Sequence, residues 1–175
     1  PPVTRFADKT LVRYSLNNAG NGFKNAADKL GKAIEAEEAG KPAVAQKWRD
    51  AAALDQRSID PFLKAAQARA AGMTREGNSW NRAGDGFYWS AEKLEKAIEA
   101  EVEGKPAVAQ KWREAAAMFE RSVDPFLKAA EALSAGKTAE GNSWINEGLG
   151  FYEAAKSLEK AIEAEVEGKP AVAQK

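Results

Sequence analysis

The residues best suited to chemistry in this sequence are closely spaced glutamates at the end of a helical pattern. Glu99, Glu101 and Glu103 concentrate negative charge, and carboxylate oxygens are the ligands that calcium and other hard cations prefer. No segment has the spacing of an EF-hand loop, and carboxylates at this spacing are typical of a solvated helix face. We therefore predict no metal site here or at the repeated group of Glu163, Glu165 and Glu167.

Histidine and cysteine are both absent from the 175 residues. Their absence removes the usual general base, the commonest zinc ligand, disulfides and thiol nucleophiles. The pair Gly84-x-Gly86 lacks the preceding strand and trailing lysine of a phosphate-binding loop. We predict that the chain is not an enzyme and binds no cofactor.

Charge and hydropathy exclude two kinds of partner. Basic and acidic residues number 26 each, so no basic stripe favours nucleic acid, and no apolar run is long enough for membrane insertion. A cysteine-free chain suits the cytosol or the cell exterior. The sequence does not determine the location; we favour the cell surface or extracellular space because such repeats are frequent there, with the cytoplasm as the alternative.

The dominant pattern is an internal repeat of 64 residues. The string Lys-Pro-Ala-Val-Ala-Gln-Lys starts at Lys41, Lys105 and Lys169, and residues 158–175 are identical to residues 94–111. Such periodicity is typical of units that stack to bury a shared core. Each unit divides into two 32-residue modules, marked by Trp48, Trp80, Trp112 and Trp144.

Within each module the apolar residues follow the spacing of a helix. They recur at steps of three and four residues, and strand-like alternation appears nowhere. We predict an all-α fold of tandem antiparallel αα-hairpins, stacked as a bundle or solenoid. Each module closes on a glycine, where helices commonly end: Gly40, Gly72, Gly104, Gly136 and Gly168. The predicted repeat core comprises Trp48, Trp80, Phe87, Leu94, Ile98, Trp112, Phe119, Phe126, Trp144, Phe151 and Leu158.

Two features leave the continuity of these helices open. Pro61 and Pro125 lie inside the second module, where we favour a kinked continuous helix over two helices. The pair Gly84 and Gly86 would cost roughly 2 kcal/mol within a helix, and we favour close approach of a neighbouring helix over a break. Polar residues suggest helix N-caps at Asn78-Ser79, Asn142-Ser143 and Thr138.

We divide the chain into an N-terminal segment at 1–14, expected to be helical, and repeat units at 15–78 and 79–142. A first half-unit follows at 143–175. Because a new module opens at Lys169, we expect the chain to be a segment of a longer array.

Two neighbouring aromatic residues depart from the repeat. Trp89 stands where the equivalent modules have Asn25 and Glu153, and a core position would not accept that set. We predict that Tyr88 and Trp89 are partly exposed and form a protein contact. The alternative is an aromatic pair lying across an adjacent helix.

The run Trp80-x-x-Ala83-Gly84-x-x-Phe87 resembles the opening helix of a tetratricopeptide repeat. The resemblance is confined to this short run in each module, and the period of 32 differs from the 34 residues of that family. It implies a helical scaffold that binds peptides or proteins. Similar runs occur at 112–119 and 144–151.

The near-identity of the units favours a role in which length or repetition matters. We expect a structural tandem-repeat protein that acts as a spacer, stalk or self-assembling scaffold, with proteins as partners, including copies of itself. The alternative is a protein- or peptide-binding helical-repeat module.

Overall fold

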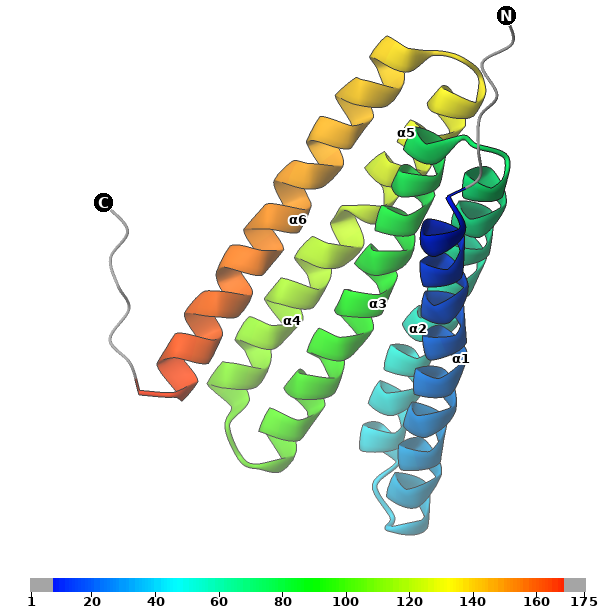
Figure 1. Ribbon diagram of the computed structural model, residues 1–175. Helices are drawn as coiled ribbons and strands as arrows, with labels where there is room; N and C mark the ends of the chain where they lie inside the picture. Colours follow the sequence, from blue (N-terminus) through cyan, green and yellow to red (C-terminus); the bar gives the residue numbers. More distant parts are fainter. Residues whose placement is uncertain (1–7, 169–175) are drawn as a thin grey trace, which may run out of the picture.

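The computed structural model describes residues 8–168, and these residues form helices without any strand. α1, α2, α3, the α4–α5 segment and α6 run antiparallel in turn, and each packs against the next (Figure 1), so the predicted all-α architecture of stacked helical hairpins is confirmed. Residues 1–7 of the predicted N-terminal segment and residues 169–175 of the last half-unit lie outside the described residues. The helices are α1 (Lys9–Glu38), α2 (Pro42–Ala70), α3 (Thr74–Val102), α4 (Pro106–Arg121), α5 (Val123–Ser134) and α6 (Thr138–Val166).

The turns between helices are built around glycines in the left-handed conformation. At the first turn Gly40 has a φ of 70°, and the Lys41 N–H donates to the Ala36 carbonyl at 2.8 Å. This six-to-one bond is the signature of a Schellman motif, which satisfies carbonyls at the helix end and reverses the chain. The same left-handed glycine recurs at Gly72, Gly104, Gly136 and Gly168.

The N-cap predictions are wrong. α3 begins at Thr74 and α6 at Thr138, so the pairs at 78–79 and 142–143 lie inside helices. The residue in the N-cap position of α6 is Lys137, which makes no side-chain cap bond. The physical reason is that each glycine turn already reverses the chain, and the helix resumes two residues after it. The polar residues at 78–79 and 142–143 therefore follow the helical path inside the helix.

The two internal prolines behave differently. α2 continues through Pro61, as predicted. The continuous helix predicted through Pro125 is wrong, because that segment is interrupted at Ser122, three residues before the proline. A proline cannot donate to the preceding turn. In both copies a serine hydroxyl donates to the carbonyl three residues earlier at 2.6 Å: Ser58 to Asp55 and Ser122 to Phe119.

α3 carries two stripes of residues, each facing a different neighbour. The bulky stripe faces α2, and the small-residue stripe faces α4 and α5. Because every stripe residue has an equivalent 64 positions away on α1 and α6, the same two-sided packing can propagate along an array. On α3 the bulky stripe is Trp80, Gly84, Phe87, Ala91, Leu94 and Ile98, and the small-residue stripe is Ser79, Ala83, Gly86, Ser90, Lys93 and Ala97.

The glycine pair in α3 allows both neighbouring helices to approach closely. A Cβ atom at Gly84 would lie 2.7 Å from the ring of Phe62 on α2, and one at Gly86 would lie 2.7 Å from Cγ2 of Val123 on α5. α3 is continuous through both glycines. The predicted close approach is therefore confirmed in α3.

The predicted division into units stays a prediction. Its boundaries at residues 15, 79 and 143 fall within α1, α3 and α6. The turns at Gly72 and Gly136 separate successive structural hairpins, each of which spans the same 64-residue period.

Candidate functional site

The predicted contact residues Tyr88 and Trp89 lie half-buried on α3. Their rings meet edge to face, with centroids 5.2 Å apart. The Nζ atoms of Lys93 and of Lys156, on α6, lie 5.3 and 4.9 Å from the centre of the Trp89 ring. Trp89 thus spans the seam between α3 and α6. Its role as a protein contact stays a prediction.

The residues predicted for the repeat core occupy two kinds of environment. Trp80, Leu94, Trp144, Phe151 and Leu158 are half-buried. The remaining ones are buried: Trp48, Phe87, Ile98, Trp112, Phe119 and Phe126.

Each tryptophan that marks a module is covered by a lysine from the preceding helix. On α2, Trp48 has the Nζ atom of Lys32 at 4.4 Å from its ring centre. The face of an indole attracts cations, so these pairs join consecutive helices. The sequence contained a signal that was missed, because a Lys-Ala pair precedes each tryptophan by 16 residues. The equivalent pairs are Lys64 with Trp80, Lys96 with Trp112, and Lys128 with Trp144.

The glutamates at the end of α3 are paired with basic residues. Glu101 accepts from Lys47 on α2 and from Arg113 on α4, and these contacts lower its pKa. Glu99 lies 3.8 Å from Lys32. Within residues 8–168 no group of three or more Asp, Glu, His or Cys residues is placed to hold a metal ion.

Two buried lysines connect helices that are equivalent in the repeat: Lys29 joins α1 to α3, and Lys93 joins α3 to α6. Lys29 on α1 lies 2.9 Å from Asp55 and 3.1 Å from Glu95. Burial alone would lower the pKa of Lys29, but the two carboxylates outweigh it and raise that pKa. Burial also raises the pKa of Asp55 to about 6 despite Lys29. Asp55 is therefore the member of this pair that takes up a proton on acidification. Lys93 makes the equivalent contact with Glu159 on α6, and its second partner is Glu92 on its own helix.

Two units differ at a largely buried polar cluster formed by Arg69, Asn81 and Asp85, which we call the polar clamp. The positions equivalent to these residues in the next unit hold Leu133, Ile145 and Leu149. Three polar residues are thus replaced together by three apolar ones. Comparing the units position by position would have revealed this set in the sequence.

The polar clamp connects three helices. The Arg69 guanidinium, on α2, donates to Ser15 on α1 at 2.5 Å and to Asn78 and Asn81 on α3 at 2.8 and 3.2 Å. Asn81 in turn donates to Asp85 at 3.1 Å. A buried polar network of this kind is stabilising only when its members are hydrogen-bonded. The clamp therefore fixes α1 in register with α3.

The polar clamp borders a hollow of about 370 Å³, also lined by Tyr152 on α6. Burial raises the pKa of Asp85 to about 6, although Asn81 and nearby arginines oppose the shift. Burial, with a smaller contribution from the Asp85 charge, raises the pKa of Tyr152 to about 12. Asp85 is consequently a group of the clamp whose charge changes in mildly acidic solution.

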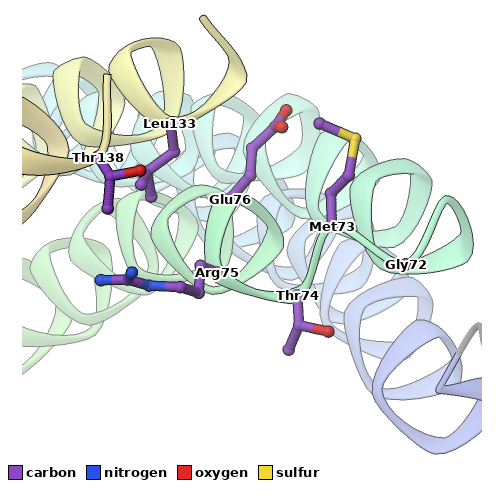
Figure 2. Close-up of a pocket in the computed structure, with 7 residues that line it drawn as sticks. All are labelled: Gly72, Met73, Thr74, Arg75, Glu76, Leu133 and Thr138. Atoms are coloured by element: carbon purple, nitrogen blue, oxygen red, sulfur yellow. The ribbon is translucent and has the colours of Figure 1, made fainter. Parts of the chain in front are cut away.

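A second hollow lies at the end of the molecule that holds the α2–α3 turn. Figure 2 shows it between Gly72 and Met73 on one side and Leu133 and Thr138 on the other. Its volume is about 320 Å³, and the Arg75 guanidinium bonds the side-chain oxygen of Asn142.

The opposite end of the molecule carries two hollows with equivalent linings, of about 700 and 280 Å³. One copy lies between α1, α2 and α3 and is lined by Lys32, Val44, Trp48, Glu99 and Val102. The other is lined by the residues 64 positions later: Lys96, Val108, Trp112, Glu163 and Val166. Val102 and Val166 are exposed. The two copies form a repeated surface with an apolar floor and a charged rim.

Comparison of the chain with family models finds no match, and no curated protein or solved structure matches it significantly. Across residues 8–168 no helix combines the length and apolar character that a membrane span requires.

Proposed function

We propose that this chain is a structural tandem-repeat protein, which acts as a spacer, stalk or self-assembling scaffold. The observation that carries the proposal is the recurrence of contacts between helices. The ring of Phe62 lies against Gly84, and that of Phe126 lies against Gly148 in the same way. Units that meet through the same contacts add at a constant orientation, so the length of the array follows the number of units.

Charged contacts recur at the same offset. The pair of Lys47 with Glu101 is repeated by Lys111 with Glu165, and Lys32 with Glu99 is repeated by Lys96 with Glu163. Exposed ion pairs contribute little stability individually. Their recurrence instead supports a fixed register between successive units.

The proposal is tested by changing the number of units. A second copy of residues 79–142 is inserted after residue 142, and a third copy in a further variant. Small-angle X-ray scattering then gives the maximum dimension, and light scattering gives the mass. We expect an equal increase in length for each inserted unit. A maximum dimension that fails to increase regularly would contradict the spacer function.

The alternative is a protein- or peptide-binding module, and the repeated hollows beside Trp48 and Trp112 favour it. A ligand with its own repeat could contact both. In the same scattering experiment, a compact curved monomer that closes around a groove supports this alternative.

A further inference from the structure

α1 exposes an apolar stripe that has no covering helix among the described residues. Phe23 and Ile34 are 62% and 54% exposed. The α1 stripe is the equivalent of the bulky stripe of α3, 64 residues earlier, and consists of Leu16, Gly20, Phe23, Ala27, Leu30 and Ile34.

The same stripe is covered on α3. There Phe87 and Ile98 are only 6% and 3% exposed, because α2 packs over them with Leu54 and Trp48. α6 repeats the arrangement, with Ile162 buried beneath Trp112 of α4. An exposed apolar stripe of this kind marks an interaction site, and the two covered copies show which kind of helix fits it.

Gly20 identifies the fit at the level of one side chain. At the equivalent Gly84 a Cβ atom would lie 2.7 Å from the ring of Phe62, and at Gly148 it would lie 2.8 Å from that of Phe126. At Gly20 it would meet nothing within 4 Å. Gly20 is thus a phenylalanine-sized slot that no described residue fills.

Charged partners of the covering helix also have counterparts on α1. Arg57 of α2 lies 4.3 Å from the ring centre of Phe87 on α3, and Lys47 of α2 pairs with Glu101. The residues of α1 equivalent to Phe87 and Glu101 are Phe23 and Glu37. A helix of the α2 type would therefore find both apolar and charged complements.

We infer that the α1 stripe docks an antiparallel helix of the α2 type, supplied by another molecule built from the same repeat. The helix carries a phenylalanine 14 residues after its tryptophan, as Phe62 follows Trp48. The inference rests on the proposed scaffold function and identifies the scaffold's partner. The proposed contact has the same form as the α2–α3 interface but joins two molecules. It is a helix-in-groove contact.

A folded second copy of this chain does not supply that helix from its described part. α2 is covered by α1 and α3, and the α4–α5 segment by α3 and α6. The donor is therefore a molecule whose array ends on an uncovered helix of this type.

The other end of the described array differs in character. On α6 the exposed small-residue stripe contains Glu147, where α1 and α3 have the buried residues Ala19 and Ala83. Burying that carboxylate without a partner would be costly. The exposed stripe of α6 is therefore a poorer surface for an apolar helix than the α1 stripe.

The test uses the full chain and a synthetic peptide of residues 42–70, labelled with a fluorophore at its N-terminus. Fluorescence anisotropy follows binding, and light scattering gives the mass of the chain alone. We expect a monomeric chain that binds one peptide saturably. Gly20→Ala places a methyl group in the slot and should weaken binding about tenfold, the effect of overpacking a contact.

Two matched controls separate the slot from general effects. Gly31→Ala changes another glycine of α1 that also has nothing within 4 Å but lies off the stripe, and it should leave binding unchanged. In the peptide, Phe62→Ala should weaken binding about tenfold, whereas replacing the exposed Gln67 with Ala should not.

The inference is overturned by an absence of saturable binding, or by binding that Gly20→Ala and Phe62→Ala leave unaltered. A chain that forms dimers through the α1 stripe would also overturn it, by showing that a second copy covers this face. The scattering experiment on lengthened arrays is independent of these results, so a failure of docking is distinguishable from a failure of the scaffold function.

Discussion

Lys96 on α3 lies over the ring of Trp112 on α4, with its Nζ atom 4.5 Å from the ring centre. The same pairing of a lysine with the tryptophan of the next helix occurs at every described junction that leads into a tryptophan-marked helix. It thus joins the two alternating kinds of helix by one type of contact. The attraction is electrostatic and directional, and it therefore contributes to orientation as well as to stability.

Replacing Lys96 with Met keeps the aliphatic stem but removes the charge. We expect the free energy of unfolding to fall by about 1 kcal/mol, the range of a partly buried cation–π contact. Chemical denaturation measures the change. The matched control is Lys160→Met, because Lys160 has the same place in the repeat but no tryptophan beside it among the described residues. Equal losses for both variants would show that the contact contributes nothing specific.

Replacing equivalent glycines with alanine should have opposite effects. Gly20→Ala adds a methyl group in open space and should stabilise the protein by up to about 1 kcal/mol through helix propensity. Gly84→Ala forces a methyl group against the buried ring of Phe62 and should destabilise it by about 1–2 kcal/mol. Denaturant midpoints measure both changes. If the two variants shift in the same direction, the close approach of α2 and α3 is wrong.

Stability should depend on pH through Asp85. Its pKa is about 6 in the folded protein and is raised from the ordinary value of 3.8. Between these values the folded state binds more protons than the unfolded state, so stability rises as the pH falls through this window. Asp85→Asn should remove up to about 3 kcal/mol of this rise, since each pKa unit corresponds to 1.36 kcal/mol.

Denaturation at pH 4 and pH 7 measures the effect. The control is the exposed residue Asp28, because Asp28→Asn makes the same substitution at the surface. Asp55, whose pKa burial also raises to about 6, supplies a similar rise in both variants. An unaltered pH profile in Asp85→Asn would contradict the burial of its charge.

The polar clamp should be replaceable only as a set. Arg69→Leu alone removes the guanidinium that donates to the buried residues Ser15 and Asn81 and should cost about 1–3 kcal/mol. The triple variant Arg69→Leu, Asn81→Ile and Asp85→Leu copies the apolar residues of the next unit and should recover most of this loss. A double-mutant cycle measures the coupling. Strict additivity of the three changes would contradict a connected network.

Much of the fold could be predicted from the sequence because local signals coincide. The spacing of apolar residues and the glycine at the end of each module indicate the helices, and the structure places a left-handed glycine at Gly40 and at each later turn. The predicted N-caps were wrong because polar residues such as Ser79 resemble caps but lie inside α3. Periodicity identifies an apolar face without identifying what covers it.

The side-chain contacts that differ between units could not be predicted from helix periodicity. Arg69 lies on α2 and Asn81 on α3. Only the packing of α1, α2 and α3 brings the two side chains together. Similarly, the sequence gives Phe23 and Phe87 equivalent positions, yet one is exposed and the other buried. That difference depends on the presence of a neighbouring helix rather than on local sequence.

The account depends on the principle that each hairpin is stable only against its neighbours. The most direct test is the thermal unfolding of the single hairpin at residues 73–136, which is cut at the glycine turns so that α3, α4 and α5 stay whole. Circular dichroism compares it with the full chain. We predict that the isolated hairpin melts at a much lower temperature or is largely unfolded, because both of its outer faces are exposed. A melting temperature equal to that of the full chain would contradict the account.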